Sequence, residues 1–140
     1  MFVHEHWREK TKMMSLLIVE DNARMRRLLK SLVADLVFPV HECGYVTEAL
    51  AVYSAQLPNW VLIDIDLRTN DGIAVTHKIK AAYPEAHIII VTNFDDAELR
   101  EAAREAGACG YVLKDNLLAI RELIGNPHSM STRTISNLQL

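Results

Sequence analysis

Five short apolar runs recur along the chain, and polar or helically spaced segments separate them. We predict that these runs are strands at 16–20, 38–43, 60–64, 87–92 and 110–113. Continuous apolar runs of this length are typical of parallel strands that are buried on both faces. Pro39 cannot donate a ladder hydrogen bond, so the second run is expected at an edge of the sheet.

The segments between the runs predict helices. Asp21 or Asn22 is a suitable N-cap for the first helix. Its apolar residues repeat at helical spacing and predict one buried stripe: Met25, Leu28, Leu29, Leu32, Val33 and Leu36. Further helices are expected at about 47–56, 73–83, 97–106 and 117–124. Strands that alternate with helices specify a doubly wound α/β domain, with a parallel sheet and helices on both faces.

The two ends of the chain differ from this pattern. Residues 1–14 are mostly polar and are expected to form a flexible extension, whereas residues 125–140 form a polar tail without periodicity. Such a tail buries too little apolar surface to order itself, so we expect it to be disordered. The domain itself is expected at 15–124.

Composition narrows the class of protein. The chain has 140 residues, of which 50% are hydrophobic, enough for one core, and its net charge is -3. It lacks the basic stripe of a protein that binds nucleic acid directly. No apolar run reaches the roughly 18 residues of a membrane span, and no signal peptide is evident. Cys43 and Cys109 are expected to be reduced, largely buried thiols, which favours a cytoplasmic location.

Polar residues that could take part in catalysis or in ligand binding stand where the strands end. Glu20 and Asp21 end the first strand, and Asp64 ends the third. Thr92 ends the fourth strand, and Lys114 follows the fifth. Because the carboxyl ends of parallel strands meet at one edge of the sheet, these side chains are expected to converge there. A single Asp at such a position is most often a helix cap or a turn residue, but that reading does not explain the set.

Three carboxylates at one edge repel one another unless a hard cation neutralises them. Mg²⁺ prefers oxygen ligands and usually retains waters, which leaves room for a phosphoryl oxygen. An aspartate can then act as a nucleophile while a lysine balances the charge of the transferring group. We therefore predict that Asp64 accepts a phosphoryl group, with Thr92 donating to a phosphoryl oxygen and Lys114 as the cation.

From Ser15 to about Ile124 these residues together resemble the receiver domain of bacterial two-component response regulators. The resemblance lies in four separated motifs, LLIVEDN, DIDLRTNDG, IIIVTN and GYVLKD. It implies a flavodoxin-like strand order of 2-1-3-4-5. It also implies a role for each site residue: metal ligation by Glu20, Asp21, Asp64 and the backbone carbonyl of Asp66, phosphoryl acceptance by Asp64, cationic support by Lys114, and switching by Thr92 and Tyr111.

The resemblance further implies a signalling domain and not an enzyme. A histidine kinase or phosphotransfer protein would phosphorylate Asp64, which would draw Thr92 toward the phosphoryl group and let Tyr111 repack inward. These shifts would alter the surface of residues 97–124 for a downstream protein partner. Receivers often pair through such a surface, so the resemblance also allows a homodimer. From the composition, neither direct binding to nucleic acid nor a membrane partner is expected.

The sequence departs from the common receiver pattern at several positions. Arg68 and Asp115 stand where many receivers have proline, the latter often after a cis peptide bond. A cis bond before a non-proline residue costs about 3–4 kcal/mol, so the Lys114–Asp115 bond is expected to be trans or visibly strained. Asn93 is larger than the usual residue after the threonine. We expect Asp66 and Asn93 to tune the attack of water on the aspartyl phosphate.

Two alternatives remain open from the sequence. Asp64-Ile65-Asp66 resembles the Asp-x-Asp signature of haloacid dehalogenase-type phosphatases, although Arg68 stands where that pattern has Thr or Val. A degenerate receiver that serves only as a protein-interaction module is the other. The complete set of acids, Thr92 and Lys114 argues against it.

Overall fold

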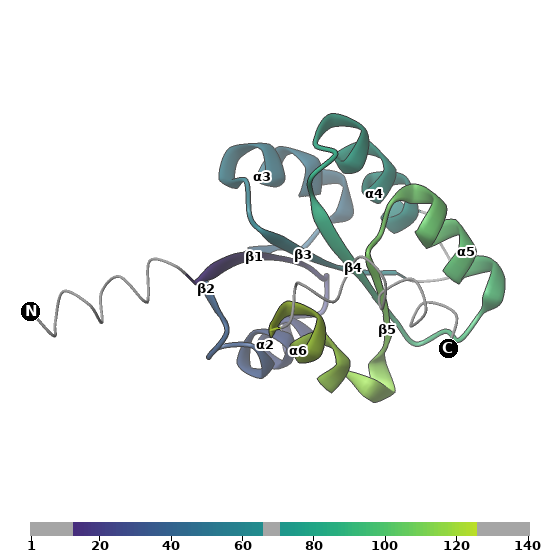
Figure 1. Ribbon diagram of the computed structural model, residues 1–140. Helices are drawn as coiled ribbons and strands as arrows, with labels where there is room; N and C mark the ends of the chain where they lie inside the picture. Colours follow the sequence, from purple (N-terminus) through teal and green to yellow (C-terminus); the bar gives the residue numbers. More distant parts are fainter. Residues whose placement is uncertain (1–12, 66–70, 126–140) are drawn as a thin grey trace, which may run out of the picture.

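The computed structural model describes residues 13–65 and 71–125. Its centre is a parallel sheet in the order β2-β1-β3-β4-β5 (Figure 1). The strands are β1 (Met14–Val19), β2 (Val37–Cys43), β3 (Trp60–Asp64), β4 (His87–Thr92) and β5 (Gly110–Leu113). The doubly wound fold and its strand order are confirmed, and β2 lies at an edge as predicted.

Helices cover both faces of the sheet. Figure 1 shows α3, α4 and α5 on one face and α2 and α6 on the other. Their bounds are α2 (Ala23–Leu32), α3 (Ala49–Gln56), α4 (Asp71–Ala82), α5 (Ala97–Ala106) and α6 (Leu118–Gly125). Two short 3-10 helices, η1 (Val46–Glu48) and η2 (Lys114–Asn116), precede α3 and α6. The segment predicted as one helix at 47–56 is therefore divided between η1 and α3.

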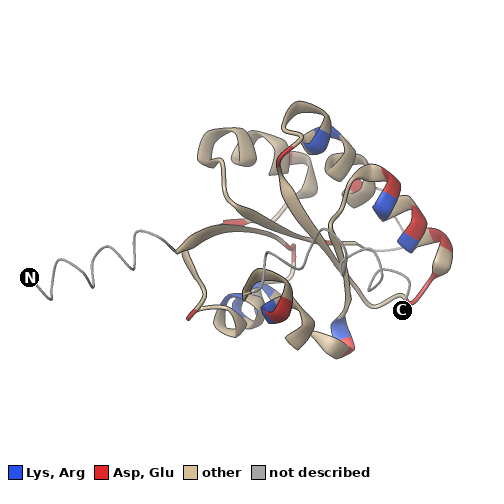
Figure 2. Ribbon diagram, viewed as in Figure 1, with Lys and Arg blue, Asp and Glu red and all other residues tan. Residues whose placement is uncertain are grey.

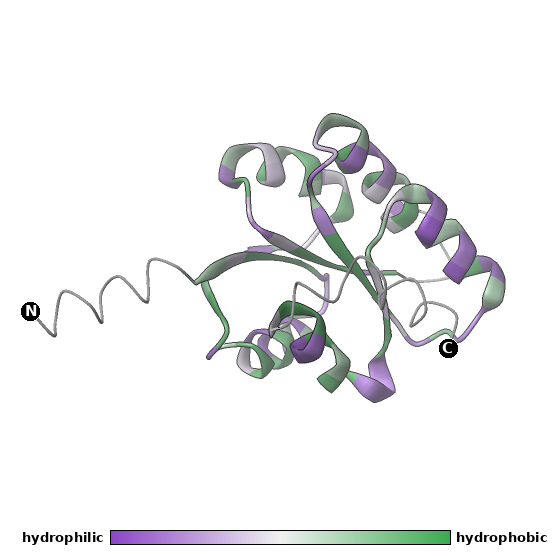
Figure 3. Ribbon diagram, in the orientation of Figure 1, coloured by the Kyte–Doolittle hydropathy of each residue, from purple (hydrophilic) through white to green (hydrophobic). Residues whose placement is uncertain are grey.

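The strands send alternate residues into two separate cores. In β1, Leu17 and Val19 face the side of α3, α4 and α5, whereas Leu16 and Ile18 face the side of α2 and α6. The middle of the sheet is coloured mainly hydrophobic in Figure 3. Burial on both faces explains why β1, β3, β4 and β5 are largely apolar runs with polar residues at or near their ends, whereas the edge strand β2 carries His41 and Glu42 within it.

Helix α2 corrects one sequence prediction. Leu29 and Val33 are buried, but Leu28 is 46% exposed. Adjacent helical residues lie about 100° apart, so a stripe centred on Leu29 and Val33 leaves Leu28 facing solvent. The helix begins as predicted, because the Asn22 side chain accepts a hydrogen bond from Met25 N at 2.9 Å.

Further sequence predictions concern the cysteines, the Lys114–Asp115 peptide bond, membrane helices and the two ends of the chain. Cys43 is buried, Cys109 is partly buried, and both are free thiols. Phe38–Pro39 is the one cis peptide bond in the described part of the chain, so Lys114–Asp115 is trans as predicted. Within the same residues, none of the helices combines the length and apolarity that a membrane crossing requires. Nearly all of the predicted extension (1–14) and tail (125–140) lies outside the described residues.

Candidate functional site

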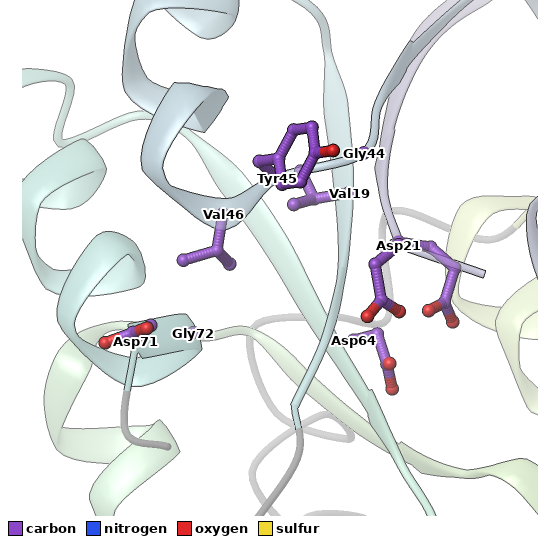
Figure 4. A pocket seen from close by; sticks show the side chains of 9 residues that line it. Val19, Asp21, Gly44, Tyr45, Val46, Asp64, Asp71 and Gly72 are labelled. Atoms are coloured by element: carbon purple, nitrogen blue, oxygen red, sulfur yellow. The ribbon is translucent and has the colours of Figure 1, made fainter. Parts of the chain in front are cut away.

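Three carboxylates converge where β1 and β3 end. Glu20 and Asp21 directly follow β1, and Asp64 is the last residue of β3, the neighbouring strand. One oxygen from each lies within 4.8 Å of the other two. Figure 4 shows Asp21 and Asp64 side by side at the mouth of a pocket. Glu20 is buried, Asp64 is partly buried and Asp21 is exposed, so the predicted cluster exists and opens to solvent on one side.

Lys114 reaches this cluster from the side of β5, opposite to β1. It follows β5, which is two strands away from β3, and its long side chain spans the end of β4. Its Nζ lies 2.8 Å from Asp64 Oδ1 and 3.6 Å from Glu20 Oε1. Neither of these two buried oxygens has an aligned hydrogen bond within the described residues. One ammonium group therefore pairs with two of the three acids and partly offsets their buried negative charge.

The pKa values follow from this crowding. Burial, followed by the hydrogen bond and charge of Asp64, raises the pKa of Glu20 to about 8. Burial lowers the pKa of Lys114, but its ion pairs with Asp64 and Glu20 outweigh that effect and raise it overall. Lys114 thus stays charged, and Glu20 gains from either a proton or a cation. Two buried carboxylate oxygens that lack an aligned hydrogen bond in the described part of the chain, beside an exposed third acid, form an all-oxygen donor set that fits a hard divalent cation.

Thr92 and Tyr111 are linked through the loop that follows β4. The buried Thr92 hydroxyl donates to Ile65 O at 2.9 Å and accepts from Phe94 N at 3.3 Å. The Tyr111 hydroxyl donates to Phe94 O at 2.6 Å, and its ring is already 93% buried, since 7% is exposed. The two predicted switch residues therefore both form hydrogen bonds to the backbone of the same loop residue, Phe94, which no sequence motif indicated.

Arg100 completes this arrangement. Its guanidinium carbon lies 5.0 Å from the centre of the Tyr111 ring, and its Nη2 lies 2.5 Å from Asp95 Oδ1. Burial raises the pKa of Tyr111 to about 12. The phenol therefore remains a hydrogen-bond donor at neutral pH. No signal in the sequence marked Arg100, because its contacts depend on how the loop folds back.

A cavity of about 180 Å³ adjoins the carboxylates (Figure 4). It lies between the loop after β2 and the start of α4, and it is lined by Val19, Glu20, Asp21, Gly44, Tyr45, Val46, Asp64, Asp71 and Gly72. A Cβ atom at Gly72 would lie 2.6 Å from Ile65 Cγ1, so a glycine lets α4 begin this close to the end of β3. Tyr45, which is exposed and lines this cavity, belongs to no motif identified in the sequence.

One residue of the predicted site, Asp66, whose backbone carbonyl is an expected metal ligand, lies outside the described residues, and so does Arg68, a departure from the receiver pattern. Asn93 is exposed beside Thr92. The structure thus brings together Glu20, Asp21, Asp64 and Lys114, while the Thr92 hydroxyl bonds to the backbone beside them.

Sequence similarity supports this picture. The family described as response regulator receiver domain matches residues 16–124. Chemotaxis protein CheY of Halobacterium salinarum is 35% identical over 98 residues, which cover 70% of this chain and 82% of that protein. The uncharacterised transcriptional regulatory protein YhcZ of Bacillus subtilis is 32% identical over 125 residues, which cover 85% of this chain. The chain spans only 58% of the length of YhcZ.

Solved structures show the same fold. A two-component response regulator of the LuxR family from Aurantimonas superposes with a TM-score of 0.78 at 24% identity, covering 91% of this chain and 96% of that chain. A DNA-binding response regulator of the same family from Staphylococcus aureus gives 0.72 at 25% identity, covering 81% and 97%. None of these similarities supports a haloacid dehalogenase-type phosphatase. The chain belongs to the response regulator receiver family.

Proposed function

We propose that Asp64 accepts a phosphoryl group from a histidine kinase or phosphotransfer protein, in a reaction that depends on Mg²⁺. The observation that carries the proposal is the cluster itself, in which Asp64 Oδ1 lies 2.8 Å from Lys114 Nζ and beside two further carboxylates. Such a concentration of charge is costly in a folded protein, and phosphoryl transfer needs groups of this kind.

Each residue would have a separate role. An oxygen of Asp64 would form the new O–P bond as the N–P bond to the donor imidazole breaks and the imidazole is protonated. Glu20, Asp21, Asp64 and the carbonyl of Asp66 would hold Mg²⁺, which when bound neutralises charge on the phosphoryl oxygens. Lys114 would keep its position and exchange its contact with Asp64 for one with a phosphoryl oxygen. Asp64 is suited to attack because its side chain is partly exposed, whereas Glu20 is buried.

The switch would begin at Thr92. Its hydroxyl would turn from Ile65 O to the phosphoryl group, and the bond from Phe94 N would transmit that movement to the loop held by Tyr111. The surface of α5, β5 and α6 would then change its affinity for a downstream protein or for a second copy of the chain. Asp66 and Asn93 would tune hydrolysis of the aspartyl phosphate. On this proposal the chain works in the cytoplasm as a signalling domain.

Incubation with acetyl phosphate and Mg²⁺, followed by intact-protein mass spectrometry, tests the function. We expect one labile phosphoryl adduct that is absent from Asp64→Asn and retained in Asp71→Asn, a control that alters another acid of the same cavity. A wild-type protein that gains no adduct would indicate a degenerate interaction module. Continuous release of phosphate without an adduct would indicate a phosphatase.

A further inference from the structure

The back of the carboxylate cluster is braced by an arginine on α2. Arg26 Nη1 donates to the backbone oxygen of Glu20 at 2.7 Å, and Arg26 Nε donates to Glu42 Oε1 on β2 at 3.3 Å. The side chain is mostly buried, although α2 is rich in other basic residues that face solvent (Figure 2). Arg26 therefore joins the end of β1 to the edge strand.

The bond to Glu20 comes at the point where β1 leaves the sheet. Glu20 N still donates to Cys43 O at 3.0 Å, which is the last contact of this strand with β2. Beyond it the chain turns into α2, and Asn22 N donates to Glu20 Oε2 at 3.3 Å. Arg26 supplies the partner that the sheet no longer offers to the Glu20 carbonyl. The turn that carries Glu20 and Asp21 is thus fixed from the sheet, from the helix cap and from Arg26.

The orientation of Arg26 is itself determined by Glu42. One oxygen of Glu42 accepts from Arg26 Nε, and the other lies 3.4 Å from Lys30 Nζ. Arg26 makes two bonds with different nitrogens, because Nη1 donates to the Glu20 carbonyl and Nε donates to the Glu42 carboxylate. A lysine has a single nitrogen at its tip and cannot make both bonds in this planar geometry.

We propose that Arg26 is a positioning residue for the cation site: it holds the Glu20–Asp21 turn so that both carboxylates face Asp64. This inference rests on the proposed function to the extent that Mg²⁺ binds these three acids. Within the described residues Arg26 bonds to the Glu20 backbone oxygen and to Glu42, and to none of the three carboxylates, so it acts through the backbone. Groups that orient metal ligands typically change metal affinity by about 10–100-fold when they are removed.

Electrostatics predicts the opposite sign, which makes the inference testable. Loss of a positive charge near three carboxylates should strengthen the binding of a cation if charge alone matters. Loss of positioning should weaken it. The direction of the change in Mg²⁺ affinity therefore separates the two effects.

The experiment is an isothermal titration of the full chain with Mg²⁺. We expect Arg26→Met to raise the Mg²⁺ dissociation constant about tenfold, and Arg26→Lys to raise it by a similar factor although the charge is kept. Lys30→Met is the matched control, because it removes a charge from the same Glu42 without a bond to Glu20. Its affinity should equal or slightly exceed that of the wild type. Mg²⁺ binding by Arg26→Met as tight as that of the wild type, or tighter, would overturn the inference.

Phosphorylation by acetyl phosphate supplies a second readout. In Arg26→Met the Mg²⁺ concentration for half-maximal rate should rise about tenfold, while the rate at saturating Mg²⁺ stays within about twofold of the wild type. A fall in the saturated rate with unchanged Mg²⁺ dependence would contradict a positioning role.

Folding is checked by circular dichroism. If Arg26→Met does not fold, Arg26→Lys carries the test, because it keeps the charge and loses one of the two bonds, and we still expect a rise of about tenfold in the Mg²⁺ dissociation constant. An unchanged constant in Arg26→Lys would then overturn the inference. Failure of the wild type itself to bind Mg²⁺ and to accept a phosphoryl group would overturn the proposed function, whereas a competent wild type with indifferent variants overturns the inference alone.

Discussion

The two ends of the sheet differ in whether their polar groups have hydrogen-bond partners. At the amino end, Ser15 N and Ser15 Oγ donate to Asn59 Oδ1 at 2.8 and 3.2 Å, and Asn59 N donates back to Ser15 Oγ at 3.1 Å. At the carboxyl end, Glu20 Oε1 and Asp64 Oδ1 are buried, and among the described residues they share the ammonium group of Lys114 without an aligned hydrogen bond. Both ends belong to the same strands, so sheet geometry does not explain the contrast. At the amino end these donors and acceptors are paired, which stabilises the fold, whereas at the carboxyl end the acids outnumber the cations.

Removing Lys114, which forms ion pairs with both Asp64 and Glu20 at the carboxyl end, should have the largest effect. Lys114→Met leaves buried carboxylates without a counter-charge, and we expect a loss of about 2–3 kcal/mol in the free energy of unfolding without Mg²⁺. The same change should tighten Mg²⁺ binding, because the competing ammonium is gone. Urea unfolding with and without Mg²⁺ measures both effects. Asp64→Asn, which removes a repelling charge, should not destabilise the protein, and equal losses in the two variants would contradict this account.

Mg²⁺ should stabilise the wild type, since a cation meets the shortage at the carboxyl end. At a concentration 100 times the dissociation constant, binding to the native state alone adds about 2.7 kcal/mol. Thermal unfolding in Mg²⁺ against a chelator measures this gain. Asp21→Ala should lose most of it, while Asn59→Ala should retain it. A gain in Asp21→Ala equal to that of the wild type would argue against cation binding at Glu20, Asp21 and Asp64.

The amino end should respond only in stability. Asn59→Ala removes the acceptor for both Ser15 groups, and we expect a loss of about 1–2 kcal/mol in the free energy of unfolding. Phosphorylation by acetyl phosphate should proceed at the wild-type rate. A slower rate in this variant, measured where both proteins are folded, would show that the two ends are coupled. Asn59→Asp keeps an acceptor oxygen and serves as the conservative control.

The contrast between the ends also explains what the sequence could predict. Convergence of Glu20, Asp21, Asp64 and Lys114 follows from strand ends that share one edge, so apolar runs and their terminal residues were enough. The bond from Thr92 to Ile65 O, the shared contact at Phe94 and the brace by Arg26 depend on loop paths and side-chain rotamers. Helical spacing likewise misplaced Leu28, because periodicity does not say where a stripe is centred. The roles predicted for the site residues, those of Asp66 and Asn93 among them, remain predictions.

The smallest effect we expect is a pH dependence that originates at the amino end. His87 begins β4, and its ring centre lies 5.1 Å from that of Trp60. Burial lowers the pKa of His87 from its ordinary value of 6.5, and the charge of Lys80 adds to this effect. The unfolded chain therefore takes up a proton before the folded protein does as the pH falls below about 6.5.

Stability from the neutral His87 is thus fully present above pH 6.5 and is lost as the pH falls toward the lower pKa of the folded state. His87→Gln should show a flatter fall in the free energy of unfolding between about pH 7 and 5 than the wild type. Urea unfolding at several pH values measures the slope, and His77→Gln, which changes an exposed histidine on α4, should leave it unaltered. Identical slopes for the wild type and His87→Gln would show that the pH dependence arises elsewhere, with the crowded acids of the carboxyl end as the next group to test.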